Sequence, residues 1–191
     1  MTSGWIAYVD ESMRVGAGAY VLAAACLEVV ECEDARRTVA GLAKPGQRFH
    51  WRQSSVPMQH KAVGVVAGLP ALHLVVVAAP LDPRRQERGR RQCLRRLLFE
   101  LENSGVGRVV MEAREQRLNA RDIQAVDAFR AAGLIGPDIV VEHAYPAGPA
   151  GEPLLWVPDI VAGAIGGELD RGDPLAGQLS SVVTRYYIEL N

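Results

Sequence analysis

Three acidic residues interrupt stretches of this 191-residue chain that are otherwise apolar. Asp10 follows the apolar run 5–9 and precedes Glu11, and Glu112 ends the apolar run in the segment VVMEAR. Asp159 lies inside the apolar segment LLWVPDIVAGAIGG. A carboxylate on a buried face is costly unless it is paired or binds a cation. Three such carboxylates from three separate segments predict one shared cation site.

Carboxylate groups in this pattern are suited to hard divalent ions. Magnesium prefers carboxylate oxygens and retains water ligands. Two such ions held by shared carboxylates activate water and stabilise the leaving oxygen in phosphoryl transfer. The residues therefore predict a magnesium or manganese site made of Asp10, Glu112 and Asp159 that is suited to phosphoryl transfer.

Each acid also has a structural interpretation. Asp10 can cap a turn, and Glu112 can pair with Arg114 at the end of a strand. Asp159 follows Pro158, and proline prefers the first turn of a helix, where the helix dipole also favours an acid. Both interpretations stay open, because a carboxylate at the start of a helix can also meet a metal ion.

Arginines crowd the first half of a predicted helix at residues 83–103. Those expected to contact phosphate are Arg84, Arg85, Arg88, Arg91 and Arg95. They lie opposite an apolar stripe formed by Leu94, Leu97, Leu98 and Leu101. Guanidinium groups bind phosphate well, so this surface is a candidate contact for nucleic acid. The alternative is a solvated helix face that pairs in part with the acids Glu87, Glu100 and Glu102.

A second candidate stretch is His50-Trp51-Arg52. His50 could carry a proton or contact phosphate, and Trp51 could stack on a base. The alternative is a histidine packed beside aromatic residues and hydrogen bonded there. Nucleophile and nucleotide motifs are not indicated, because the serine pairs lie outside a G-x-S-x-G turn and no P-loop lysine follows the early glycines.

The elements that must position these residues follow from hydrophobic periodicity and turn signals. Strands are expected at about 5–9, 20–27, 72–79, 107–113, 138–144 and 182–190, and helices at about 33–43, 57–68, 83–103, 119–132 and 154–169. A turn is expected at 13–17, and Asn119 is expected to cap its helix. A hairpin followed by alternating strands and helices indicates one α/β domain over residues 1–191, a mixed sheet flanked by helices.

Composition limits the class of protein. The formal net charge of −1 gives no bulk attraction to nucleic acid, although a local patch could. The three cysteines show no C-x-x-C spacing, so neither a disulfide framework nor a zinc site is expected. The apolar segment after Arg14 is too short and too glycine-rich to cross a membrane. We expect a cytoplasmic protein with reduced thiols and no membrane partner.

At four dispersed points the chain resembles the domain-of-unknown-function family numbered 3800. The points are the triplet Asp10-Glu11-Ser12, the pair Phe49-His50, the segment 112–122 and the segment 159–163. The chain departs from the family pattern at Met13, where glycine is usual, and at Pro158, where alanine is usual.

The resemblance implies a ribonuclease H-like fold in which carboxylates on the first strand, a later strand and the last helix gather two metal ions. Transferred to this chain, these are Asp10, Glu112 and Asp159. Accessory roles would fall to Glu11, His50, Arg114 and Asp122. Two functions are compatible with this: a metal-dependent nuclease or phosphodiesterase, or an inactive nucleic-acid- or protein-binding module on the same fold in a defence or mobile-element system.

Overall fold

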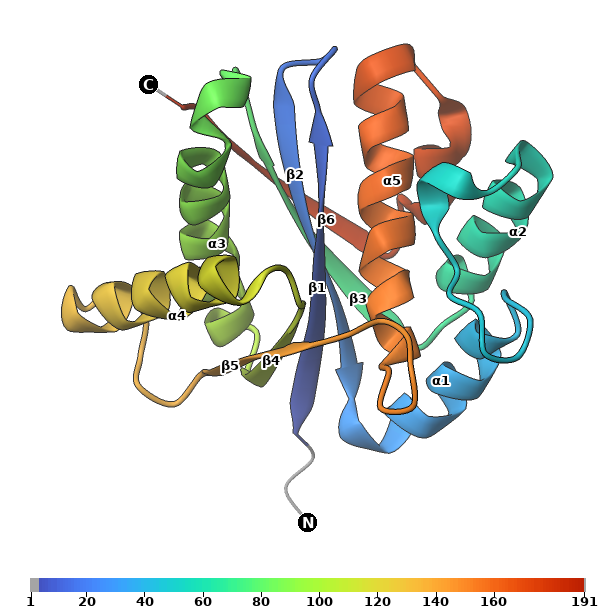
Figure 1. The fold of residues 1–191 in the computed structure, drawn as a ribbon, viewed down its shortest axis with the longest axis horizontal. Coiled ribbons are helices and arrows are strands. Elements are labelled where there is room, and N and C mark those ends of the chain that lie inside the picture. The colour runs from blue at the N-terminus through green and yellow to red at the C-terminus, as the bar shows by residue number, and fades with distance from the viewer. Residues whose placement is uncertain (1–3, 191) are drawn as a thin grey trace.

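In the computed structural model, which describes residues 4–190, one mixed sheet carries helices on both faces (Figure 1). The strands are β1 (Trp5–Arg14), β2 (Ala19–Glu28), β3 (Ala71–Ala78), β4 (Val106–Glu112), β5 (Val140–Ala144) and β6 (Val183–Ile188). Their order is β5-β4-β1-β2-β3-β6. β1 and β3 run antiparallel to β2, while β4 is parallel to β1 and β5, and β6 is parallel to β3.

The helices divide between the two faces of the sheet (Figure 1). They are α1 (Cys32–Ala40), α2 (Val56–Ala67), α3 (Gln86–Asn103), α4 (Gln116–Ala131) and α5 (Trp156–Arg171). α1, α2 and α5 cover one face, and α3 and α4 cover the other, each over its own buried apolar cluster. The predicted α/β class is confirmed, and the mixed sheet flanked by helices is consistent with a ribonuclease H-like fold.

Alternation along β1 decides where its polar residues point. Tyr8 belongs to the cluster under α5, and Val9 belongs to the cluster under α3. Successive side chains of a strand point to opposite faces, so Asp10 faces α5 and Glu11 faces α3. This arrangement separates the two acids that are adjacent in the sequence.

Two of the boundaries that differ from the sequence-based expectation concern candidate site residues or their neighbours. β1 does not end before Asp10 but continues to Arg14, which pairs with Ala19, and the turn covers residues 15–18. Pairing with β2, which is apolar except for Glu28 at its end, keeps this polar part of β1 in the sheet. The expected cap at Asn119 is wrong, because α4 begins at Gln116. The Asn119 side chain instead accepts a hydrogen bond from the Arg114 backbone N–H.

The hydrophobic helices all serve the core. No helix within residues 4–190 has the length and apolar character that a membrane crossing requires. The helix with the most buried residues, α5, lies against β1 and β2.

His73 on β3 is a buried histidine with a predictable effect on stability. It is 1% exposed, and neither ring nitrogen has a hydrogen-bond partner within residues 4–190. Burial lowers the pKa of His73 to about 4. The folded state then holds fewer protons than the unfolded state between the two pKa values, so the free energy of unfolding falls as pH drops below about 6.5.

We expect His73→Leu to remove this loss. The wild type should lose about 3 kcal/mol more than the variant between pH 7 and pH 4, because each unit of pKa shift corresponds to about 1.4 kcal/mol. Urea unfolding at a series of pH values measures the difference. His60→Leu, on the exposed side of α2, is the matched control and should follow the wild type. Parallel pH profiles for wild type and His73→Leu would contradict the prediction.

Candidate functional site

Two of the three acids are placed by neighbouring parallel strands. The last β1–β4 pair joins Val9 to Met111, and the next residue on each strand is an acid, Asp10 or Glu112. Side-chain alternation carries both acids to the face covered by α5. The sheet therefore presents two carboxylates side by side at the carboxyl end of β4.

The third acid is placed by α5 and by the loop before α2. Asp159 lies in the first turn of α5, and its Oδ2 accepts a hydrogen bond from the Trp51 backbone N–H at 3.0 Å. The loop comes close to the helix at Gly163, where a Cβ atom would lie 2.4 Å from the Trp51 ring. Glycine at this position thus lets the loop hold Asp159 beside the sheet.

One cavity of about 400 Å³ contains all three acids and is hereafter the acid pocket. The other side chains that line it include Ser12, Arg48, His50, Trp51 and Arg52. The loop that supplies the basic residues is fixed to the strand as well, because the Arg52 Nη2 donates to the Met13 carbonyl at 2.9 Å. Asp10, Glu112, Asp159 and His50, all candidate site residues from the sequence, therefore line the same cavity.

The acids of the pocket destabilise one another's charged forms. Burial raises the pKa of Asp10 well above its usual range, and the charges of Glu112 and Asp159 raise it further. Burial also raises the pKa of Glu112 and of Asp159. No hydrogen bond or ion pair to the Asp10 carboxylate is found among residues 4–190. The negative charge gathered here is thus compensated only in part.

Arg48 supplies most of the compensation. Its Nη2 donates to both carboxylate oxygens of Glu112, at 2.8 and 2.9 Å. This ion pair lowers the pKa of Glu112 against the larger effect of burial. The Arg48 Nε is buried without a hydrogen-bond partner in the part of the chain that the structure describes. The guanidinium group is therefore held mainly by Glu112.

The donor chemistry of the acid pocket fits a hard divalent cation, since three carboxylates with raised pKa values line one cavity. In their present positions, however, these side chains do not form a cation site. Within residues 4–190, no group of three or more His, Cys, Asp or Glu side chains is arranged to hold a metal ion. One of the three acids, Glu112, is bound to Arg48 and would have to leave that ion pair to become a cation ligand.

The two aromatic candidates differ in their surroundings. His50 lines the acid pocket, and its Nδ1 has no hydrogen-bond partner within the described residues. Trp51 is 4% exposed and packs against α5 at Gly163. The hypothesis that Trp51 stacks on a base is wrong, because the helix covers its ring.

The remaining accessory candidates form a separate network on the α3 face. Asp122 accepts hydrogen bonds from the Nε and Nη2 of Arg90 at 2.9 and 2.8 Å, and from Arg114 at 3.1 and 3.2 Å. His143 lies 3.3 Å from the same carboxylate. Glu11 forms an ion pair with Arg90. Asp122 and Arg114 therefore lie outside the acid pocket, whereas Glu11 lines the pocket and also joins the network.

The network keeps Asp122 charged. Burial by itself would raise the pKa of Asp122, but hydrogen bonds from His143 and Arg90, together with the charges of Arg90 and Arg114, hold it well below its usual range. Glu11 is the residue after Asp10, so the network also fixes the part of β1 that carries the first acid of the pocket.

The predicted phosphate-contacting arginines are all exposed on or just before α3. They are Arg84, Arg85, Arg88, Arg91 and Arg95. None forms a salt bridge with a carboxylate among residues 4–190. The acids expected to neutralise them are engaged elsewhere: Glu87 with Arg114, Glu100 with Arg96, and Glu102 with the backbone N–H of Gly136. The α3 surface therefore keeps its positive charge.

Comparisons with protein-family models, with curated proteins and with solved structures find no match to this chain. The resemblance to the domain-of-unknown-function family numbered 3800 accordingly stays a prediction.

Proposed function

We propose that this protein is a divalent-cation-dependent nuclease or phosphodiesterase, with Asp10, Glu112 and Asp159 as ligands to magnesium or manganese. The observation that carries the proposal is that these three carboxylates line one cavity, where the charges of Glu112 and Asp159 raise the pKa of Asp10. A bound cation would relieve their repulsion and would supply Lewis acidity toward a phosphodiester.

The residues of the chain have distinct tasks in this proposal. Asp10 is fixed by the sheet and Asp159 by the Trp51 backbone N–H, so both are positioned before any ligand arrives. Glu112 would give up its ion pair with Arg48 in order to hold the cation. Once released, Arg48 is a hydrogen-bond donor for a phosphate oxygen. His50 lines the same cavity and can carry a proton to or from the ester.

The proposal is tested by hydrolysis and thermal unfolding measured on the same samples. We expect cleavage of labelled single- or double-stranded DNA or RNA with manganese or magnesium, and none with EDTA. We also expect the cation to raise the melting temperature by about 5–10 °C at a hundredfold excess over its Kd, since this excess stabilises by about 2.7 kcal/mol. Glu112→Gln and Asp159→Asn should lose both responses.

Asp127→Asn is the matched control, because Asp127 is an exposed acid on α4 that pairs only with Arg130 in the described chain. It should keep both responses. Cation-dependent cleavage that survives in Glu112→Gln and Asp159→Asn would exclude the acid pocket as the catalytic site.

A second candidate is a binding module that lacks catalysis. The Arg48–Glu112 ion pair favours it, because the guanidinium group already occupies one of the three proposed ligands. This candidate requires that divalent cations leave the melting temperature unchanged while nucleic-acid or protein binding persists in Glu112→Gln. For either function we propose a cytoplasmic setting, in keeping with three buried free cysteines.

A further inference from the structure

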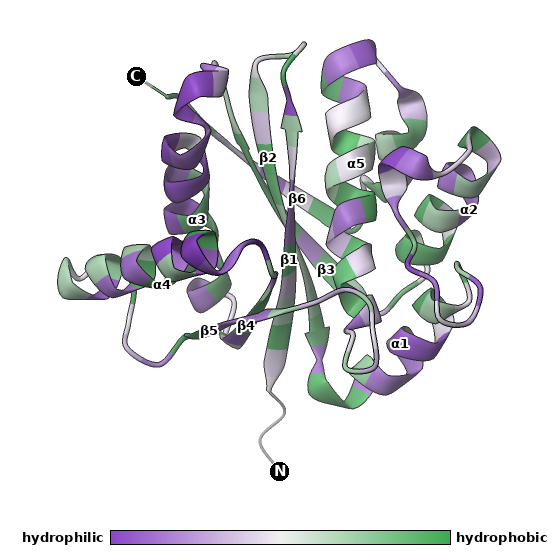
Figure 2. Cartoon of the chain, in the orientation of Figure 1, coloured by the Kyte–Doolittle hydropathy of each residue, from purple (hydrophilic) through white to green (hydrophobic). Residues whose placement is uncertain are grey.

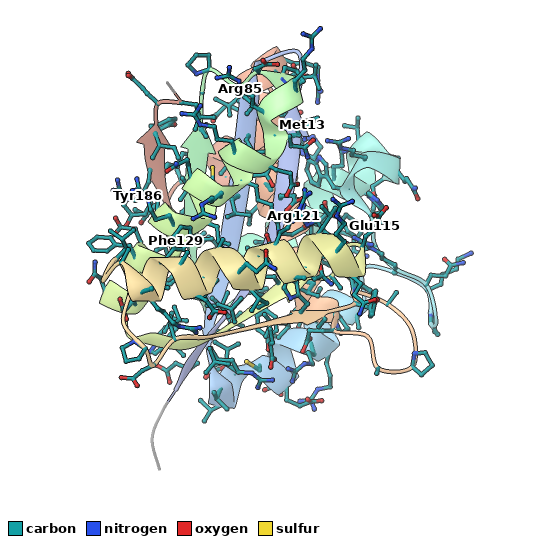
Figure 3. The ribbon with its side chains drawn as sticks, turned by 60° about the vertical axis from the view of Figure 1, so that its left-hand side comes forward. Met13, Arg85, Glu115, Arg121, Phe129 and Tyr186 are labelled. Carbon is teal, nitrogen blue, oxygen red and sulfur yellow. The ribbon has the colours of Figure 1, made fainter. Side chains whose placement is uncertain are left out.

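A second cavity, of about 350 Å³, lies between α3 and α4 on the sheet face opposite α5. Four arginines line it: Arg88, Arg90, Arg91 and Arg121. Its two acids are Glu87 and Asp122. Figure 3 shows Arg121 extending from the side of α4 that faces α3. Two helices thus contribute guanidinium groups to one cavity.

The charges of this cavity do not cancel. Asp122 is bound by Arg90 and Arg114, and Glu87 is bound by Arg114 at 2.8 Å. No carboxylate within residues 4–190 pairs with Arg88, Arg91 or Arg121. The guanidinium of Arg91 lies over the Phe129 ring, 5.2 Å from its centroid, which orients it without neutralising it. We name the cavity with these three residues, Arg88, Arg91 and Arg121, the arginine groove.

The positive surface extends beyond the cavity along α3. Arg88, Arg91 and Arg95 are spaced three and four residues apart, so they form one stripe on the exposed side of the helix. At 1.5 Å of rise per residue the stripe is about 10 Å long. α3 is hydrophilic along most of its length (Figure 2), and Arg85 continues the surface at its amino-terminal end (Figure 3).

We propose that the arginine groove binds the phosphodiester backbone of a nucleic-acid strand. Guanidinium groups match the geometry of phosphate oxygens, and three of them converge here without acidic partners. A single small phosphate would need only the cavity. The stripe that continues to Arg95 offers contacts to further phosphate groups, which favours a nucleic-acid strand over a small phosphate ligand. This site is independent of cation chemistry in the acid pocket.

Fluorescence polarisation of the full-length protein with a labelled 20-nucleotide single strand tests the groove. EDTA is present, so binding is measured apart from any hydrolysis, and failure of the proposed enzyme activity leaves the result unaffected. The test variant is Arg88→Gln/Arg91→Gln/Arg121→Gln. The matched control, Arg37→Gln/Lys44→Gln/Lys61→Gln, removes three exposed charges from α1, α2 and the loop between them.

Salt dependence gives the expected size of the effect. Each phosphate contact on a single strand contributes about −0.7 to the slope of log K against log salt, so three lost contacts reduce the slope by about 2. The quantity to compare is the binding constant of the wild type divided by that of the groove variant. This ratio should be about twentyfold larger at 50 mM salt than at 200 mM salt. The control variant should keep the wild-type slope.

Three outcomes would overturn the proposal. The first is that the wild type does not bind the strand, and the second is that both triple variants lose the same amount of affinity for it. The third is that pyrophosphate displaces the labelled strand as well as the unlabelled strand does when the two competitors are compared at equal concentrations of phosphate groups. The last outcome would assign the groove to a small phosphate ligand. If the triple variant fails to fold, Arg121→Gln alone should reduce the slope by about 0.7, against no change for Lys61→Gln.

Discussion

Asp10→Asn is expected to abolish cation-dependent hydrolysis while raising the stability of the protein in EDTA. Removing one ligand of a catalytic cation forfeits several kcal/mol of transition-state stabilisation, and about 4 kcal/mol corresponds to a rate loss of about a thousandfold. The gain in stability follows from the raised pKa of Asp10, because the ionised carboxylate is disfavoured by burial and by its acidic neighbours.

The sign of the pH dependence follows from the same shift. A carboxyl group whose pKa is higher in the folded state than in the unfolded state holds its proton more tightly when folded. Its favourable contribution is complete below the unfolded pKa, near 4, and is lost as pH rises through the folded pKa. The advantage of Asp10→Asn over the wild type should therefore grow from pH 4.5 to pH 8, where we expect about 1 kcal/mol, or about 3 °C.

Thermal unfolding in EDTA across this pH range measures the effect. His73 is present in both proteins, so its own pH dependence cancels in the difference. Asp127→Asn again serves as the control and should not gain stability with pH. An Asp10→Asn protein that is less stable than the wild type at pH 8 would contradict this prediction. It would show that the Asp10 carboxylate stabilises the fold, for example by capping a turn.

The fold was predictable where local pattern and pairing agree. The apolar run of β3 and the alternation that separates Asp10 from Glu11 are local signals, and the structure follows them. The end of β1 was not predictable from local composition, because residues 10–14 are mostly polar. Their place in the sheet comes from the paired strand β2, whose residues are nearly all buried.

The acids of the candidate site could be found in the sequence because each one interrupts an apolar segment. Arg48 gave no such signal. It lies in an irregular loop, and its contact with Glu112 spans 64 positions. The loop is placed by the packing of Trp51 against Gly163, which only the folded arrangement of α5 reveals. Arg90 likewise has no sequence signal that separates it from the exposed arginines of α3, although it is buried and bound to Asp122.

Among the substitutions considered for their effect on stability, Asp122→Ala is expected to cause the largest loss, lowering the free energy of unfolding by about 3–5 kcal/mol. Asp122 is 4% exposed and Arg90 is 2% exposed, so removal of the carboxylate leaves a buried guanidinium whose only partners within residues 4–190 are Glu11 and Tyr20. Breaking a buried ion pair by removing one member carries a cost of this size. Urea unfolding at pH 7 measures it, and Asp127→Ala on the same helix should change stability by less than about 0.5 kcal/mol.

Two further measurements test whether Asp122→Ala is destabilised by the unpaired charge of Arg90 or by a simple loss of packing. The loss of stability in Arg90→Leu/Asp122→Leu should be smaller than the sum of the losses in the two single variants, because the double change leaves no unpaired member of the pair.

The depressed pKa of Asp122 also determines the pH range over which its carboxylate stabilises the protein. Its contribution is complete above the unfolded pKa, near 4, and is lost as pH falls through the folded pKa. The gap between wild type and Asp122→Ala should thus stay constant from pH 8 to pH 5 and narrow only below about pH 4. A gap that closes at neutral pH would show that the Asp122 carboxylate is not held charged by Arg90 and Arg114.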